Sequence, residues 1–298
     1  MNLGYACINT ALSANKIFTN RTMRRKTFDA NGEDYVSDLA LANVKDLKII
    51  IQWNNEMKIK LFRLSSQIFP WSDEYNVKDL KDYDEIAELM LEIGKIAKDA
   101  GQRLTMHPGP YNCLASPTQK VVEKTIRELN FHSEQFNMMG YDPSPYNKIN
   151  IHVGGAYGDK KGTLDAFCHN FKLLNEDTKK RLVIENDDSP NEYSVNDLYW
   201  GIHKRIGIPI TFDYFHHKFN TGTLTEEEAL RMAATTWPKE ITQCCHYSES
   251  RRKEKLDESI RPQAHSDIIY NKINTYGLNP DIVIEAKLKE QSIFNYAK

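Results

Sequence analysis

Long hydrophobic runs are missing from this sequence, and none approaches the roughly 18 consecutive apolar residues that a membrane-spanning helix needs. The first ten residues, MNLGYACINT, also lack the basic segment and apolar core of a secretory signal peptide. We therefore expect no membrane partner and an intracellular location, cytoplasmic or nucleoid-associated in a prokaryote. A nuclear or viral setting stays open.

Cysteine is scarce and the charges nearly balance. The five cysteines are an odd number without CxxC spacing, which favours reduced thiols over a disulfide framework or a cysteine zinc site. A formal net charge of -2 does not by itself indicate a nucleic-acid-binding protein. Two basic clusters stand out, one with Arg21, Arg24, Arg25 and Lys26, the other with Arg251, Arg252, Lys253 and Lys255. Bound divalent cations would add positive charge where a phosphate binds, so nucleic acid remains a candidate partner.

The chain has no internal repeat, no low-complexity tract and no linker rich in Pro, Gly or Ser that would mark a domain boundary. Its 298 residues, 40% of them hydrophobic, are enough for one large core. We therefore expect residues 1–298 to form a single domain.

Short β-rich runs alternate with amphipathic segments along the whole chain. The expected strands are residues 2–8, 60–65, 102–107, 148–153, 181–185, 208–212, 241–247 and 281–285. The expected helices are residues 35–56, 84–100, 121–139, 163–180, 195–205, 225–234 and 268–276. Eight strands alternating with helices predict a (β/α)₈ TIM barrel, for which ~250 residues is typical. A doubly wound open sheet is the alternative, but it rarely has eight strands and so few residues outside them.

The stretch IPITFDYFHHK, residues 208–218, is an example of an expected strand that ends in polar, potentially metal-binding residues. An apolar, β-branched run stops at Phe212, and Asp213 and His216 follow directly. A carboxylate oxygen and an imidazole nitrogen at one strand end suit Mn, Zn or Fe(II). A helix N-cap or a solvated turn is the alternative interpretation of a single cluster of this kind.

The same arrangement recurs at the other expected strand ends, which all open onto one face of a barrel. Seven or eight such ligands are too many for one ion with an open position. They suit two or three ions bridged by a carboxylate, and Glu185 is the natural bridge. We expect His132, His169 and His203, which fall in expected helices, not to be ligands. The predicted metal ligands are His107, His152, Glu185, Asp213, His216, His246, His265 and Glu285.

A site with several divalent ions can activate water near neutral pH and bind both the attacking and the leaving oxygen of an in-line displacement at phosphorus. This chemistry indicates phosphodiester hydrolysis. A sugar isomerase or epimerase of the same barrel class is the second hypothesis, with the ions binding vicinal hydroxyls and a carboxylate or His acting as base.

An ordered set of short motifs resembles the ultraviolet damage endonuclease family, whose barrel is similar to that of endonuclease IV. The matches extend from Leu3 to about Lys289 in the family's order. They are LGY at residue 3, RLSS at 63, HPG at 107, IHVGG at 151, IEND at 184, FD at 212, HH at 216, HYS at 246, HSD at 265 and IEAK at 284.

The resemblance implies an endonuclease that nicks duplex DNA immediately 5′ to cyclobutane pyrimidine dimers and 6-4 photoproducts, with abasic sites as a further candidate. Such an enzyme initiates alternative excision repair without ATP or another nucleotide cofactor. The resemblance implies two to three divalent ions, manganese first and zinc, cobalt or magnesium as alternatives. It places Glu185 in catalysis and Lys287 beside the site, within reach of a phosphate. We expect a monomer.

The resemblance also implies contacts with damaged DNA. Family members insert a polar and an aromatic residue from the loop after the third strand; Pro110 stands here where the family has Gln, and Tyr111 is the aromatic partner. Tyr5 matches a second aromatic probe. Cys244 replaces a lysine that some members carry and carboxylate, so a third ion would be bound differently or not at all. A non-catalytic damage-binding protein is therefore the third hypothesis. The predicted DNA contacts are Tyr5, Asn9, Arg21, Arg24, Arg25, Arg63, Pro110, Tyr111 and Lys287.

Overall fold

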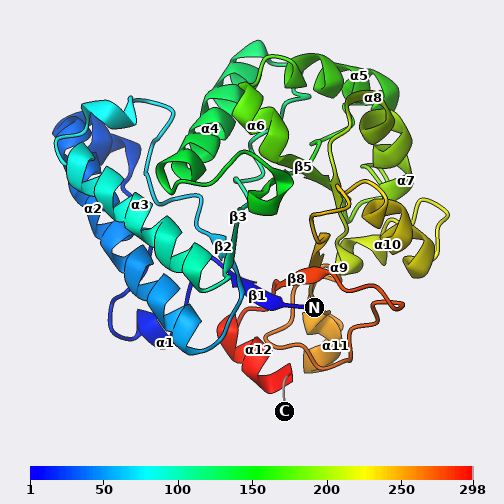
Figure 1. The fold of residues 1–298 in the computed structure, drawn as a ribbon. Helices are drawn as coiled ribbons and strands as arrows, with labels where there is room; N and C mark the ends of the chain where they lie inside the picture. Colours follow the sequence, from blue (N-terminus) through cyan, green and yellow to red (C-terminus); the bar gives the residue numbers. More distant parts are fainter. Residues whose placement is uncertain (297–298) are drawn as a thin grey trace.

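Eight parallel strands form the wall of a barrel in the computed structural model, which describes residues 1–296 (Figure 1). Their order in the sheet is β6-β5-β4-β3-β2-β1-β8-β7. The two ends of the sheet meet, because the backbone N–H of His246 donates to the carbonyl oxygen of Phe212 at 2.9 Å and a parallel bridge joins Asp213 to His246. The predicted TIM barrel is confirmed, and the open-sheet alternative is wrong. The strands are β1 (Leu3–Ala6), β2 (Leu61–Leu64), β3 (Arg103–Met106), β4 (Ile149–Ile151), β5 (Leu182–Glu185), β6 (Ile210–Thr211), β7 (Cys244–Tyr247) and β8 (Asp281–Ile284).

Helices surround the strands on the outside (Figure 1). They are α1 (Thr10–Ser13), α2 (Arg25–Glu56), α3 (Tyr83–Asp99), α4 (Gln119–Met138), α5 (Lys160–Phe171), α6 (Glu176–Arg181), α7 (Val195–Leu198), α8 (Lys204–Ile206), α9 (Tyr214–His217), α10 (Glu226–Ala234), α11 (Arg251–Lys255) and α12 (Glu290–Tyr296). Shorter turns are η1 (Val77–Asp79), η2 (Pro145–Asn147) and the π-helical η3 (Tyr199–His203). Among residues 1–296, no helix combines the length and the apolar character that crossing a bilayer requires.

Helix α3 shows how sequence spacing produces this outer layer. Ile86, Met90, Ile93 and Ala97 recur every three or four residues and are all fully buried, so one stripe of the helix faces the core. A side chain at Gly94 would collide with the carbonyl oxygen of Met139, at the end of α4. Glycine therefore lets two neighbouring helices pack closely at this point.

All eight expected strands are confirmed, but the expected helix at residues 268–276 is wrong. The backbone N–H groups of this segment donate to side chains instead of to carbonyls one turn earlier. Those of Asp267 and Ile268 donate to Glu254, and those of Tyr270 and Asn271 donate to Glu249. Because the buried carboxylate of Glu249 and the partly buried carboxylate of Glu254 accept from these donors, the segment stays a loop whose apolar residues still contact the core.

Two further helix predictions need adjustment. The expected helix over residues 163–180 is interrupted, and its parts are α5 and α6. Helix α2 begins ten residues before the expected start at residue 35, and it kinks at Gly32, which has φ 61°. Glycine tolerates that backbone conformation, so the chain continues through a position where most residues would end a helix.

Candidate metal centre at the carboxyl end of the barrel

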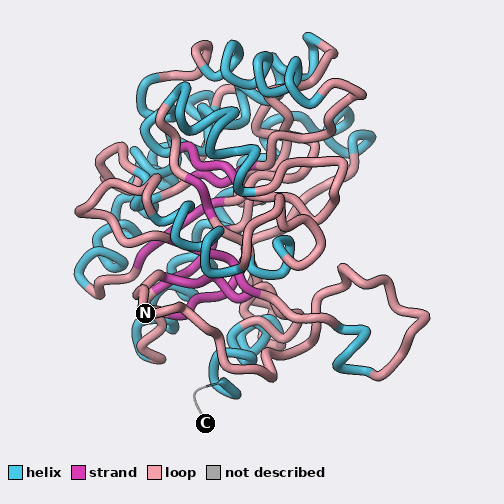
Figure 2. The backbone as a smooth tube through the Cα atoms, turned by 90° about the vertical axis from the view of Figure 1, so that its right-hand side faces the viewer, coloured by secondary structure: helices cyan, strands magenta, loops and turns pink. Residues whose placement is uncertain are grey.

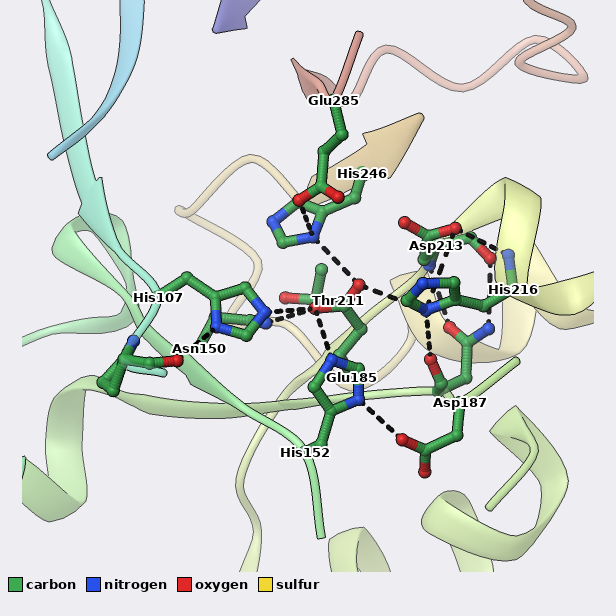
Figure 3. Close-up of polar contacts among 12 residues, drawn as sticks. His107, Asn150, His152, Glu185, Asp187, Thr211, Asp213, His216, His246 and Glu285 are labelled. Atoms are coloured by element: carbon green, nitrogen blue, oxygen red, sulfur yellow. Dashed lines mark hydrogen bonds and ion pairs between the residues drawn. The ribbon is translucent and has the colours of Figure 1, made fainter. Parts of the chain in front are cut away.

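Imidazoles from several strand ends surround the carboxylate of Glu185, the last residue of β5 (Figure 3). His107 Nε2 lies 3.2 Å from Glu185 Oε2, and His246 Nδ1 lies 3.0 Å from Glu185 Oε1. His152 Nε2 lies 3.7 Å from Oε2, and His216 Nδ1 lies 3.5 Å from Oε1. His107, His152 and His216 follow β3, β4 and β6, and His246 lies in β7, so residues far apart in sequence meet at one point.

These five side chains form two groups that share Glu185. One group is His107, Glu185 and His246, and the other is His152, Glu185 and His216. Within each group the candidate ligand atoms all lie within 4.8 Å of one another. Two nitrogen ligands and a shared carboxylate are a donor set that divalent ions such as Zn²⁺ and Mn²⁺ accept. The geometry therefore offers two adjacent ion sites with one bridging carboxylate.

The other three predicted ligands border these groups. Asp213 is fully buried, and its Oδ1 caps α9 by accepting from the backbone N–H groups of Phe215 and His216. Its Oδ2 is buried and has no hydrogen-bond partner among residues 1–296. The free Oδ2, beside His216, could bind a metal ion. Asp213 can therefore cap α9 with one oxygen and act as a metal ligand with the other.

Glu285 lies beside His246, and His265 lies beside Glu285. Glu285 Oε1 is 3.4 Å from His246 Nδ1, and Glu285 also forms a close ion pair with Arg63. His265 Nδ1 is 2.9 Å from the Glu285 carbonyl oxygen and 3.8 Å from its carboxylate. Arg63, which we expected to contact DNA, is instead paired with Glu285 and only 14% exposed.

The carboxylates and imidazoles of this cluster shift one another's pKa values. Burial would raise the pKa of Glu185, but His246 and His152 hold it well below its usual value. Burial opposes protonation of His152, yet the carboxylates of Glu185 and Asp187 raise its pKa to about 10. Burial likewise opposes protonation of His216, while Asp213 and Glu185 raise its pKa to about 9. The protons on these imidazoles therefore supply the positive charge that bound metal ions would otherwise supply.

Lys148 is a member of the site that the sequence interpretation missed. It is fully buried, and its Nζ lies 3.0 Å from His246 Nε2, 2.9 Å from Thr211 Oγ1 and 3.2 Å from Asn150 Oδ1. Asn150 in turn donates a hydrogen bond to Glu185. Lys148 thus supports the bridging carboxylate through two residues, and it turns Nδ1 of His246 toward the ion site. Residues 148, 150 and 152 alternate along one strand, and that period of two was the available signal.

Further contacts orient the imidazoles from behind. His152 Nδ1 lies 2.7 Å from Asp187 Oδ1, and His107 Nδ1 lies 3.0 Å from the Pro108 carbonyl oxygen. Such partners fix which ring nitrogen is left for a metal. Of the histidines expected not to be ligands, His132 contacts the Glu128 carbonyl oxygen within α4, and His203 contacts the Ile208 carbonyl oxygen just beyond α8.

The loop after β3 presents Pro110 and Tyr111 at the rim of the barrel. Tyr111 is 56% exposed, and a side chain at Gly109 would collide with its ring. Asn112 anchors the loop by donating to the Gly109 carbonyl oxygen at 3.2 Å and to Glu128 at 2.9 Å. The loop is therefore held at its base, and the side chains of Pro110 and Tyr111 are exposed.

Tyr5 and Asn9 do not reach this surface, contrary to expectation. Both are fully buried. The Tyr5 hydroxyl donates to Asn54 of α2 at 2.7 Å and accepts from Asn9 at 2.9 Å. Because side chains alternate along a strand, Tyr5 points into the helix layer instead of toward the barrel mouth.

Two members of the first basic cluster are ion-paired: Arg21 through a partly buried pair and Arg25 through exposed pairs. Arg21 donates to Asp46 at 2.6 Å and to the Phe18 carbonyl oxygen. Arg25 pairs with Asp29 and Glu74, each at 2.8 Å. Arg24 and Lys287, the other predicted phosphate contacts, have exposed side chains.

Comparison with known proteins gives a family match over the whole chain. A family model described as UV-endonuclease UvdE matches residues 1–298. The UV-damage endonuclease of Schizosaccharomyces pombe is 36% identical over 311 residues, covering 99% of this chain and 50% of the relative. The UV-damage endonuclease of Neurospora crassa is 33% identical over 344 residues, covering 98% of this chain and 50% of the relative. The chain spans about half the length of these two relatives.

Among solved structures, that of SacUVDE has a TM-score of 0.84 at 30% identity and covers 98% of this chain and 95% of its own. Endonuclease IV from Thermus thermophilus has a TM-score of 0.57 at 12% identity, covering 100% and 97% of the two chains. D-psicose 3-epimerase from Clostridium cellulolyticum has a TM-score of 0.55 at 12% identity, covering 95% and 84%. The last two likenesses concern the fold alone.

Proposed function

We propose, from the premise that the chain belongs to the UV-endonuclease UvdE family, that it is a divalent-metal-dependent endonuclease acting on ultraviolet-damaged duplex DNA. It would hydrolyse the phosphodiester immediately 5′ to cyclobutane pyrimidine dimers and 6-4 photoproducts, with manganese as the first candidate metal and no nucleotide cofactor. The observation that carries this proposal is the pair of histidine groups that share Glu185.

His107 and His246 would hold one ion, His152 and His216 the other, and Glu185 would bridge them. Ions bound there would lower the pKa of a water molecule and offset negative charge at phosphorus. Asp213 would contribute its unpaired Oδ2 beside His216. The imidazoles must lose their protons to bind metal, and their partners fix the orientation in which they do so.

A third ion would require Glu285 and His265. Arg63 already neutralises the Glu285 carboxylate, so such an ion would have to displace a buried guanidinium. We therefore propose two ions as the working state. Lys287, exposed just after β8, would contact a phosphate of the bound strand.

Pro110 and Tyr111 would enter the duplex at the lesion. Damaged steps cost less to kink and unstack than intact ones, and that difference would supply selectivity. Proline can act as a wedge but cannot donate a hydrogen bond from its own backbone nitrogen, so Tyr111 would carry the polar contact.

Incision of an end-labelled duplex carrying one defined thymine dimer tests the proposal. With Mn²⁺ present we expect a single cut immediately 5′ to the dimer, absent from the undamaged duplex and abolished by chelation. Bound Mn²⁺ without any cut would reject the endonuclease. Only the shared fold supports the sugar-epimerase hypothesis. Turnover of ketohexoses by the same preparation would support that hypothesis instead.

A further inference from the structure

Residues 248–266, which we call the α11 arm, project from the barrel. The arm follows β7, contains the short helix α11 and is joined at its base by an antiparallel bridge between Ser250 and His265. In Figure 2 it reaches further from the body than the neighbouring loops. Because it directly follows β7, it lies on the side of the barrel where the strands end. It carries the second basic cluster, and no residue of that cluster belongs to the metal centre.

The base of the arm is rigidly anchored. Glu249 is 2% exposed and accepts hydrogen bonds from the Tyr247 hydroxyl at 2.8 Å and from the Tyr270 backbone N–H at 2.6 Å. The N–H of Ser266 donates to the Glu249 carbonyl oxygen at 2.7 Å. His265, beside Glu285 of the metal centre, is part of the same base. The arm is therefore a fixed extension of the site.

The cations of the arm are surface groups held by weak pairs. Lys255 lies 2.7 Å from Asp267, and Arg252 lies 2.9 Å from Glu258, which is 88% exposed. Lys253 has no ion-pair partner among residues 1–296. Exposed ion pairs contribute little to stability, so these cations can exchange a carboxylate for a phosphate at small cost.

The tip of the arm exposes a large apolar side chain. Leu256 is 92% exposed and has φ 52° and ψ 39°, the left-handed conformation at the end of α11. Glycine or asparagine would serve the fold better there, since leucine in this conformation strains the backbone without burying its side chain. The fold therefore gives no reason for this leucine, whereas apolar tips that enter a groove are common in DNA-binding proteins.

The arm and the Tyr111 loop stand on opposite sides of the metal centre. The loop follows β3 and the arm follows β7, four strands away in either direction around the closed barrel. Arg261, 75% exposed on the returning limb of the arm, approaches Asp188 in the loop after β5 at 3.7 Å. A duplex lying across the barrel mouth above Glu185 would therefore meet both elements.

We propose that the α11 arm is a second DNA-binding element. Lys253 and Lys255 contact phosphates of the duplex on the side away from Tyr111, and Leu256 contacts the groove between them. The inference rests on the proposed function, because it takes duplex DNA as the ligand of the barrel mouth.

The salt dependence of duplex binding tests the phosphate contacts. For the double variant Lys253→Gln/Lys255→Gln we expect weaker binding to damaged and undamaged duplexes alike. The slope of log K against log salt should fall by about 0.9 for each phosphate that the variant no longer neutralises. The matched control is Lys180→Gln/Lys239→Gln, which removes two exposed lysines that precede β5 and β7 at the other end of the barrel. Equal slopes for wild type, control and arm variant would overturn the proposal.

Leu256→Gly tests the tip separately. The melting temperature should stay the same or rise, because glycine adopts this conformation without strain. Affinity for the dimer-containing duplex should fall by about tenfold, because the variant has no apolar side chain to bury in the groove. Unchanged affinity would remove the tip from the proposal.

The outcomes also separate this inference from the proposed function. Arm-dependent DNA binding without incision would retain the arm and reject the endonuclease. Incision of the thymine-dimer duplex that is insensitive to every arm variant would retain the endonuclease and reject the arm.

Discussion

The interior of the barrel mouth and its rim are built in different ways. In the interior, Glu185, His246 and Lys148 are almost completely buried and contact one another in a chain. At the rim, Tyr111 is more than half exposed and only the base of its loop is anchored. If the proposed function holds, a substitution in the interior should therefore disturb several contacts at once and impair the chemistry, whereas a substitution at the rim should affect substrate selection alone.

Glu185→Gln should break the interior most completely. The substitution leaves one oxygen where two ion sites need a shared carboxylate, so we expect incision to fall by roughly 10³-fold or more. Circular dichroism and melting temperature should remain near wild type, because glutamine has the same shape. The measurement is single-turnover incision of the thymine-dimer duplex. A fully active variant would reject the bridging role.

Lys148→Met should have the next largest effect. It removes the donor that contacts His246 Nε2 and orients Asn150, and removal of a supporting partner of this type costs about 10–100-fold in metal affinity. Titration with Mn²⁺ followed by incision kinetics would measure it. The matched control is Lys60→Met, which removes a lysine that donates to the Ala100 carbonyl oxygen away from the site. Equal metal affinity in both variants would contradict a positioning role for Lys148.

Tyr111→Ala should act on the rim alone. Stacking of one aromatic side chain on a base contributes about 1–3 kcal/mol, so we expect the preference for damaged over undamaged duplex to fall at least fivefold. Metal content should not change. Tyr35→Ala, on the outer helix α2, is the control for loss of a partly exposed tyrosine. If affinity for both duplexes falls equally, Tyr111 does not discriminate between them.

The smallest effect that we expect is the release of protons when metal ions bind. Without ions, His152 and His216 have pKa values raised to about 10 and about 9, so both are protonated at about pH 7.5. Each must lose its proton to bind a metal, and we expect about two protons per protein to be released. Affinity should therefore rise with pH and level off above these pKa values. Calorimetry with Mn²⁺ in Tris and in Hepes would measure the release, and equal heats in both, after correction for dilution, would contradict it.

Much of the site could be predicted because parallel strands all end on the same face of a barrel. Histidines and carboxylates at the ends of apolar runs were therefore predicted to lie close together. The structure groups five of them: His107, His152, Glu185, His216 and His246. The prediction needed only the strand positions, which the apolar runs mark clearly.

The rest depends on side-chain direction and on contacts that no local pattern shows. Tyr5 lies at a strand end as the ligands do, but it points into the helix layer and bonds Asn54. In the sequence, Lys148 is a charged residue directly before a strand, a position that is usually exposed. Only its spacing of two from Asn150 indicates that its side chain points into the barrel. The loop at residues 268–276 has helical spacing, yet Glu249 and Glu254 take its backbone donors.

We propose that the strand ends form two adjacent ion sites that share Glu185. Anomalous scattering from a crystal soaked in Mn²⁺ would locate the ions. We predict two peaks flanking the Glu185 carboxylate, one contacting His107 and His246 and the other contacting His152 and His216. A single peak, or peaks that do not contact Glu185, would rule out two ion sites with a shared carboxylate.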